Sequence, residues 1–118
     1  MRPILLGLLA AILLADNVDA QRDDHQSANY LVPICQRFVA NDGNAYDIET
    51  GYCAGVITGV GSMGPSFPPG SRSCAPNSAT VTQATRVALA YIERYPQRMH
   101  ESFARLAVEA WHEAWLCK

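Results

Sequence analysis

The chain has 118 residues, a length typical of a single domain, and its formal net charge is −2. No basic patch stands out in the sequence, which argues against nucleic acid as a partner. The nearly neutral charge also provides no strong field that would attract the chain to a membrane surface.

The first twenty residues have the features of a secretory signal peptide. Arg2 supplies the charged start, and Val18-Asp19-Ala20 places small residues at positions −3 and −1 of a cleavage site. The apolar stretch over 4–15 has about 12 residues, whereas a membrane-spanning helix needs roughly 20. We therefore predict an exported protein without a membrane anchor, whose mature domain covers residues 21–118.

A first helix is predicted over residues 29–40, where apolar side chains recur at helical spacing. Pro33 must lie in the first turn of this helix or it would kink the helix. Residues 41–44 carry a turn signal, and we expect the loop that follows to run on to Thr50.

A second helix, predicted over residues 51–62, contains Gly51, Gly55 and Gly59 at four-residue spacing. Each glycine costs about 1 kcal/mol relative to alanine in a helix interior. A penalty of that size favours the close approach of another helix to a ridge without side chains. This approach is expected either inside the domain or across a dimer.

A long proline-rich loop is predicted over residues 63–79, in which residues 66–70 are expected to be extended and exposed. Loops of this length in a small domain are often functional. A spacer that is merely pinned at Cys74 is the other interpretation, and the sequence leaves both open.

Thr80 opens a third helix, predicted over residues 80–95, with a capping-box pattern that ends at Gln83. A fourth helix is predicted over residues 97–116, and its apolar residues form two adjacent stripes, more than one core-facing stripe requires. Trp111 and Trp115 lie one turn apart on this helix. These two side chains either pack in the core or anchor a subunit or partner interface, where tryptophan is enriched. The small size of the domain favours the core.

The four cysteines all follow the signal segment, and an even number in an exported chain indicates disulfides. If the first two helices form a hairpin, Cys35 lies about five residues before the turn and Cys53 about two after it. The two cysteines then lie at roughly matching distances from the turn along their helices. The last two helices would form a second hairpin with Cys74 and Cys117 at its far ends. We therefore predict an all-α, four-helix domain of two hairpins, stapled by Cys35–Cys53 and Cys74–Cys117.

The motifs that suggest chemistry are weak. Residues 59–64 fit G-x-G-x-x-G, but the dinucleotide fingerprint needs a strand before it and a helix after it. Glu109 and His112 form one E-x-x-H pair, whereas a di-iron carboxylate site needs two such pairs and two further glutamates. We assign no catalytic residue, metal ligand or cofactor site, and we predict that the chain is not an enzyme.

Several segments, in a fixed order, resemble the periplasmic immunity proteins of the Rap/Tai type, which protect bacteria from amidase toxins of type VI secretion. The most specific are Gly51-Tyr52-Cys53-x-Gly55 and the Tyr95-Pro96 segment that ends at His100-Glu101, with the cysteines in register. The other matching segments are 31–35, 56–60, 74–76, 81–83, 86–93 and 97–99, together with Ala110 and Cys117. The resemblance implies an all-helical periplasmic protein, often a homodimer, that binds a peptidoglycan amidase and sterically occludes its cysteine–histidine active site.

For the surface that contacts the amidase we predict the loop around residues 63–72, with Phe67 as an apolar plug. The predicted partner-binding residues are Met63, Ser66, Phe67, Pro68, Pro69 and Arg72. Two other classes stay open. One is a small periplasmic stress chaperone or structural protein, and a chaperone would loosen at low pH and expose apolar surface. The other is a secreted enzyme or metal-binding protein, which would need a group of catalytic or metal-ligating residues that the sequence does not show.

Overall fold

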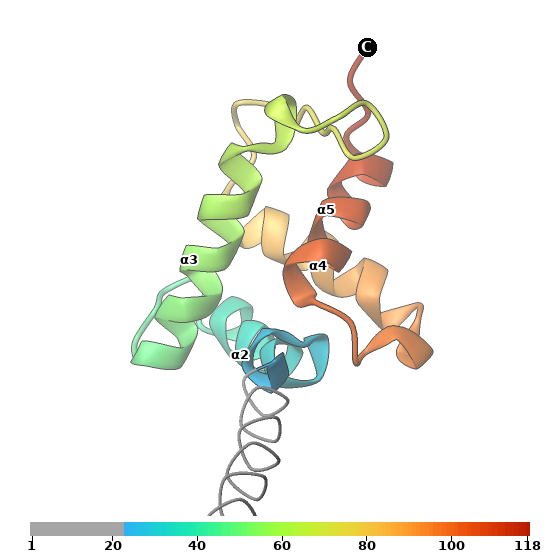
Figure 1. Ribbon diagram of the computed structural model, residues 1–118. Coiled ribbons are helices and arrows are strands. Elements are labelled where there is room, and N and C mark those ends of the chain that lie inside the picture. Colours follow the sequence, from blue (N-terminus) through green and yellow to red (C-terminus); the bar gives the residue numbers. More distant parts are fainter. Residues whose placement is uncertain (1–22) are drawn as a thin grey trace, which may run out of the picture.

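The computed structural model describes residues 23–118, and within them every named element is a helix (Figure 1). The α-helices are α2 (Ala28–Ala40), α3 (Ile48–Ser62), α4 (Val81–Glu93) and α5 (Phe103–Ala114). The 3-10 helices are η1 (Asp23–Gln26), η2 (Gly64–Ser66) and η3 (Pro96–Arg98). The predicted all-α class is confirmed, while the predicted signal peptide at 1–20 lies outside the described residues. In the described part, no helix has the length and apolar character needed to cross a membrane.

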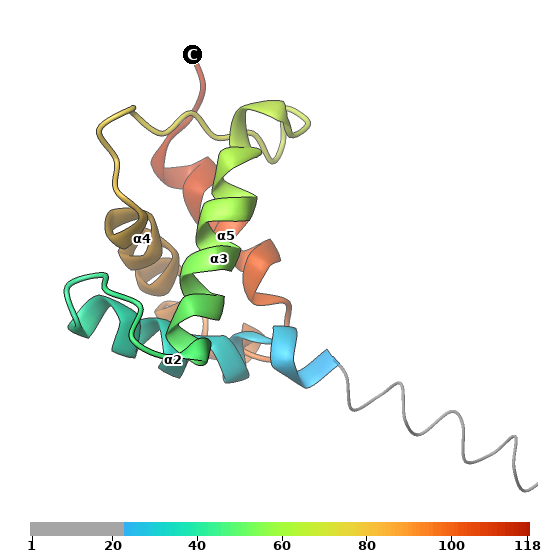
Figure 2. The same ribbon diagram turned by 90° about the vertical axis from the view of Figure 1, so that its left-hand side faces the viewer.

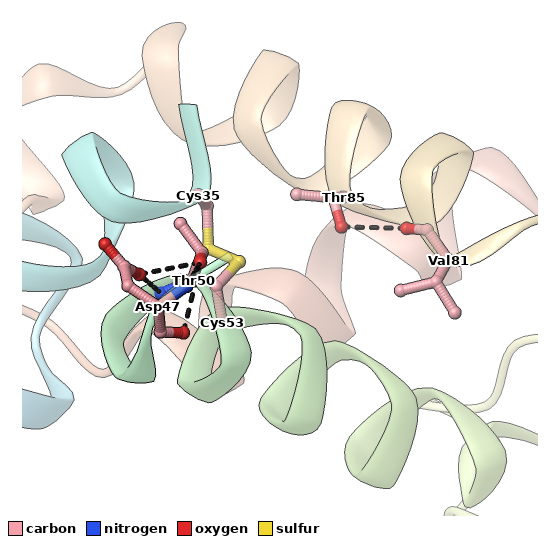
Figure 3. The surroundings of a disulfide bond; sticks show 6 residues. All are labelled: Cys35, Asp47, Thr50, Cys53, Val81 and Thr85. Atoms are coloured by element: carbon pink, nitrogen blue, oxygen red, sulfur yellow. Dashed lines mark hydrogen bonds between the residues drawn. A yellow bond between two sulfur atoms is a disulfide. The ribbon is translucent and has the colours of Figure 1, made fainter. Parts of the chain in front are cut away.

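Both predicted disulfides are present. The Cα atoms are 5.5 Å apart in Cys35–Cys53 and 5.0 Å apart in Cys74–Cys117. The first bridge links the middle of α2 to α3 (Figure 3), and the second links the segment before α4 to the residues after α5. The predicted pairing is therefore the correct one among the three that four cysteines allow, although α2 crosses α3 and does not form the antiparallel hairpin from which the pairing was argued.

Consecutive helices pack as pairs, α2 against α3 and α4 against α5. Figures 1 and 2 show that α2 lies crosswise to α3 at one end of the molecule. The segment that joins α3 to α4 crosses the opposite end, and the C terminus lies there as well. We call this opposite end, made of residues 63–80 and 115–118, the apical end.

The core lies between the four helices. Trp111 is 2% exposed, and its indole Nε1–H donates to the Ala84 carbonyl oxygen at 2.9 Å, so its predicted place in the core is confirmed. Trp115 is half-buried and packs against the same core. Besides Trp111, the large apolar side chains that are almost fully buried are Leu31, Phe38, Ile57, Ile92, Phe103 and Leu106.

Helix α3 begins at Ile48, so the prediction of a loop up to Thr50 was wrong. The Asp47 carboxylate accepts a hydrogen bond from the Thr50 backbone N–H at 2.8 Å, and the Thr50 hydroxyl oxygen accepts one from the Asp47 N–H at 3.2 Å. This reciprocal capping, drawn in Figure 3, starts the helix one turn earlier. Thr50 is fully buried, and the bond from its backbone N–H is the main reason why the pKa of the Asp47 carboxyl is lowered.

Helix α5 begins at Phe103, so the prediction of one helix over 97–116 was also wrong in its first part. The short helix η3 and a turn occupy residues 96–102, and the Ser102 side chain then caps α5. The carbonyl oxygens of Met99 and Glu101 accept hydrogen bonds from the first backbone N–H groups of α2, at 2.8 and 2.9 Å. Because these carbonyls bond to α2, they are not available to continue a helix.

Pro33 lies in the second turn of α2 and not in its first turn, as the sequence had suggested, because the helix begins at Ala28. Its ring faces solvent, as does Asn29, whose carbonyl loses the helical partner that Pro33 cannot supply. Water can reach that carbonyl, which is why the helix tolerates the proline.

Candidate functional site

The loop that follows α3 closes on itself. We call residues 63–73 the apical loop. Its base is joined by a hydrogen bond from the Ser73 N–H to the Gly64 carbonyl oxygen at 3.2 Å, and its tip holds a turn in which the Ser71 N–H donates to the Pro68 carbonyl oxygen at 2.8 Å. An ideal Cβ at Gly64 would lie 2.5 Å from Ser73 Oγ. The small space beside Ser73 therefore favours glycine at position 64, where the two ends of the loop meet.

The predicted partner-binding residues all lie on this loop, but they are not equally available to a partner. Four of them are exposed, namely Met63, Ser66, Pro68 and Pro69. Phe67 and Arg72 are half-buried, and Arg72 Nε donates to the Phe67 carbonyl oxygen at 3.1 Å. Arg72 thus holds the loop in shape, and contact with a partner stays a prediction for the whole set.

The C-terminal side of the apical loop is attached to α5 and to the residues that follow it. His112 Nδ1 lies 2.7 Å from the Arg72 carbonyl oxygen, and since a carbonyl only accepts, this nitrogen carries the proton. The next link is a hydrogen bond from the Cys74 N–H to the Trp115 carbonyl oxygen at 2.8 Å. The Cys74–Cys117 disulfide completes the attachment. The loop is therefore held in one conformation at the apical end.

A second surface is formed by the side of α3 that faces away from the core. No atom of another element lies within 4 Å of the Cβ position at Gly51, Gly55 or Gly59. Of the two alternatives that the sequence left open, close packing of these glycines inside the domain does not occur, because the buried residues of α3 lie on its opposite side. Those buried residues are Thr50, Cys53 and Ile57. Close approach across a dimer stays a prediction.

Large apolar side chains flank these glycines. Ile48 is 92% exposed, Met63 is 54% exposed and Tyr52 is 42% exposed. A hollow of about 260 Å³ lies beside Tyr52 and Met63. Its lining consists of Tyr52, Gly55, Val56, Gly59, Val60 and Met63 from the α3 side, together with Gln26, Leu31, Ser102 and Ala104. We call Ile48, Tyr52, Gly55, Gly59 and Met63 the α3 outer face. It meets the apical loop at Met63.

Both surfaces are almost without charge. Residues 50–92 contain no aspartate and no glutamate, and their only formal charges are Arg72 and Arg86. A soluble helix normally places charged residues on the side opposite the core. Glu49 is the sole charged residue of α3. The outer face therefore has the composition of a surface that contacts protein and not water.

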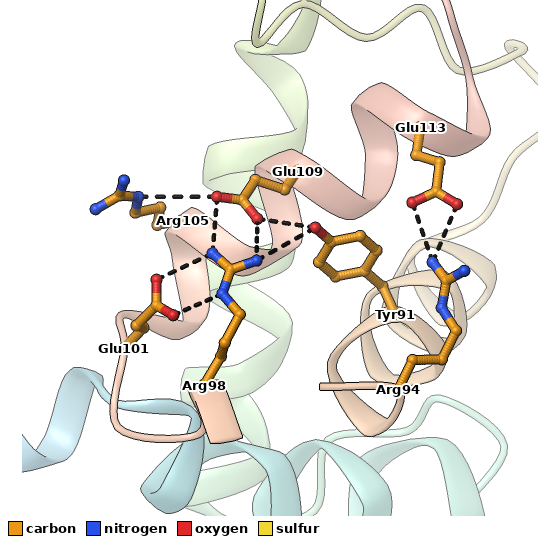
Figure 4. A network of polar contacts seen from close by, with 7 residues as sticks. All are labelled: Tyr91, Arg94, Arg98, Glu101, Arg105, Glu109 and Glu113. Atoms are coloured by element: carbon orange, nitrogen blue, oxygen red, sulfur yellow. Dashed lines mark hydrogen bonds and ion pairs between the residues drawn. The ribbon is translucent and has the colours of Figure 1, made fainter. Parts of the chain in front are cut away.

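A separate network of charged side chains lies on α4, η3, the turn after η3 and α5 (Figure 4). The Arg98 guanidinium pairs with Glu101 at 2.6 Å and with Glu109 at 2.7 Å, and the Tyr91 hydroxyl donates to Glu109 at 2.9 Å. The hydrogen bonds from Arg98 lower the pKa of both carboxyls, whereas burial raises the pKa of Tyr91.

This network also accounts for the E-x-x-H pair that the sequence singled out. Glu109 bonds to Arg98, and His112 bonds to the backbone of the apical loop, so the two side chains serve different structural contacts. Among the described residues, no three histidine, cysteine, aspartate or glutamate side chains are grouped so that they could hold a metal ion.

Sequence reasoning singled out the apical loop and the glycines of α3, but it missed the exposed apolar side chains and the lack of charge that accompany those glycines, although a signal for them exists. The stretch from Thr50 to Ile92 without a carboxylate includes the whole exposed side of α3 after its first turn. A model of the Rap1a immunity protein family matches residues 27–117. No curated protein and no solved structure matches the chain.

Proposed function

Because the chain belongs to the Rap1a immunity protein family, we propose that it works in the periplasm, where it binds a secreted peptidoglycan amidase and blocks the active site of that enzyme. The family match over residues 27–117 is the observation that carries this proposal. The features of an exported protein at residues 1–20 support the compartment, since a cell-wall amidase meets its substrate there.

The apical loop is the part best suited to enter an enzyme cleft. Its base and its tip are each closed by a backbone hydrogen bond, so little conformational freedom is lost when a partner binds. Its exposed residues at positions 66, 68 and 69 carry no charge, and a cleft can cover them without the cost of desolvating an ion. In this proposal inhibition is steric, and the immunity protein contributes no catalytic group.

We also propose that the protein forms a homodimer through the α3 outer face. Gly55 and Gly59 leave the backbone of α3 open to a second helix, and small residues at this spacing let two helices approach closely. A symmetric pair would cover Ile48, Tyr52 and Met63, which are otherwise exposed to water. Sedimentation of Gly55→Leu should then give the mass of a monomer, while the wild type gives that of a dimer. Ala90→Leu, on the exposed side of α4, is the matched control and should leave the dimer intact.

The binding test uses the oxidised mature domain and the amidase that it retains from the secreted and periplasmic proteins of the producing bacterium. Titration calorimetry gives the affinity, and hydrolysis of purified peptidoglycan gives the residual activity. Retention of one amidase, and loss of its activity at equimolar immunity protein, supports the proposal. Retention of many unrelated proteins only at acid pH would instead indicate a chaperone, and retention of nothing would count against both.

Two variants locate the contact. Pro69→Glu places a charge at the exposed tip of the apical loop, and Ala90→Glu places the same charge on the exposed side of α4. Burying an unpaired charge at an interface weakens binding by more than about tenfold, or roughly 1.4 kcal/mol. We expect this loss for Pro69→Glu and an unchanged affinity for Ala90→Glu. Equal affinities for the two variants would remove the apical loop from the contact surface.

A further inference from the structure

The two disulfides lie in different surroundings. Cys35 and Cys53 are both 0% exposed, and Figure 3 shows their bridge between α2 and α3. Cys74 is exposed and Cys117 is half-buried, at the apical end. A reductant in solution can therefore reach the second bridge directly, whereas it can reach the first only after the core has opened.

The exposed bridge lies where the apical loop is held to the rest of the protein. Cys74 directly follows Ser73, whose N–H closes the base of the loop, and its own N–H donates to the Trp115 carbonyl oxygen. On the other side of the bridge, α5 ends at Ala114, and Leu116 is 64% exposed. Within the described part of the chain, this disulfide is thus the only covalent cross-link between the loop side of α4 and the residues after α5.

We propose that Cys74–Cys117 positions the apical loop and is the bridge that a dithiol reduces first, so that reduction releases the loop while Cys35–Cys53 keeps the helical core folded. The consequence for binding rests on the proposed function. The reduced chain would bind the amidase more weakly. Tight binding would therefore require oxidation in the compartment to which the protein is exported.

The chemistry is ordinary thiol–disulfide exchange. One thiolate of the dithiol attacks the sulfur of Cys74 or Cys117, breaks the S–S bond and forms a mixed disulfide. The second thiolate of the reductant then attacks the reductant sulfur of the mixed disulfide. This breaks the mixed S–S bond, releases the second cysteine thiolate and frees the reductant as a cyclic disulfide. Two electrons pass from the dithiol to the protein, and its two protons end on the thiols of Cys74 and Cys117.

The first experiment needs no amidase. The oxidised domain is treated with increasing dithiothreitol, the new thiols are alkylated, and peptide mass spectrometry measures the label at each cysteine over time. We expect Cys74 and Cys117 to be labelled at least about tenfold faster than Cys35 and Cys53, because an opening that costs about 1.4 kcal/mol already slows a reaction tenfold. Equal labelling rates, or faster labelling of Cys35 and Cys53, would overturn the proposal.

Amide hydrogen exchange on the selectively reduced protein reports the loop itself. The Ser73 and Cys74 amides should exchange at least about tenfold faster than in the oxidised protein, while amides in the middle of α2 keep their protection. Unchanged exchange at Ser73 and Cys74 would show that the bridge does not position the loop. Loss of protection throughout α2 would show that it holds the whole fold and not the loop in particular.

The double variant Cys74→Ser/Cys117→Ser extends the test to binding, with Cys35→Ser/Cys53→Ser as the control bridge. We expect the first to bind the amidase at least about tenfold more weakly while it keeps its helical content. Unchanged affinity would overturn the positioning role. If a variant fails to fold, the selectively reduced wild type is used in its place. Failure of the oxidised wild type to bind any amidase would refute the proposed function alone, because labelling and exchange test the bridge without a partner.

Discussion

Replacing Gly64 with alanine should open the base of the apical loop. The added Cβ would lie 2.5 Å from Ser73 Oγ and 3.2 Å from the Ser73 carbonyl oxygen. The hydroxyl can rotate away, but the carbonyl belongs to the backbone that carries the closing hydrogen bond between the same two residues. Overpacking costs about 1–3 kcal/mol, so we expect a loss of about 2 kcal/mol in the free energy that keeps the loop closed. That loss corresponds to a roughly thirtyfold larger population of the open loop.

Hydrogen exchange at the Ser73 amide measures this population directly, and we expect its rate to rise by roughly thirtyfold in Gly64→Ala. Gly70→Ala is the matched control in the same loop. No atom lies within 4 Å of its Cβ position and its φ is not positive, so its effect should be neutral or stabilising by about 0.4–1 kcal/mol. Ser73→Ala in the Gly64→Ala background removes the closest contact and should restore part of the protection. Equal Ser73 exchange rates in Gly64→Ala and Gly70→Ala would refute the close contact on which this reasoning depends.

Three further predictions concern stability. Gly55→Ala should raise the free energy of unfolding, measured in urea at dilute protein, by about 1 kcal/mol, because alanine favours a helix interior and its Cβ meets no other atom. Trp111→Phe should lower the same quantity by about 1–3 kcal/mol, because it removes the N–H that bonds to Ala84 and part of a buried ring. The hydrogen bonds from Arg98 lower the pKa of Glu109 below its unfolded value of about 4.3, so this stabilisation is complete above that value and is lost as the pH falls through the lower, folded value. As the pH is lowered below about 4, the melting temperature should therefore decrease. The decrease should be smaller in Glu109→Gln than in the wild type.

Much of the fold was predictable because local signals and tertiary structure agree. The four helices, the N-cap at Thr80 and both disulfides follow from apolar spacing, capping residues and helix lengths. The errors lie where a local signal was weak or was overridden by distant residues. Threonine at the N3 position of α3 is an unusual partner in a capping box, which usually has glutamate or glutamine there. The break before Phe103 depends on hydrogen bonds to the start of α2, which no pattern near residue 100 can reveal.

The candidate site was predictable only in part, for a related reason. The prolines and glycines of residues 63–73 predict a loop, but the bonds that close it, from Ser73 to Gly64 and from His112 to Arg72, join residues whose meeting depends on the fold. The spacing of Gly51, Gly55 and Gly59 predicts close approach of another element without saying which one. Packing on α2, α4 and α5 uses the opposite side of α3, so the glycines stay open.

The charged residues that form ion pairs and the surfaces that we propose for a partner lie in different parts of the sequence. Every ion pair among the described residues is formed by side chains outside the range 50–92, such as those of Arg37 and Arg98. The uncharged range instead contributes the α3 outer face and the apical loop. A surface that only had to remain in water would gain solubility from added carboxylates at little cost. Their absence is understood if both surfaces are covered in the working state, because each buried and unpaired carboxylate would weaken the contact. The family match implies a protein partner, and the uncharged range makes the α3 outer face and the apical loop the surfaces that we propose for it.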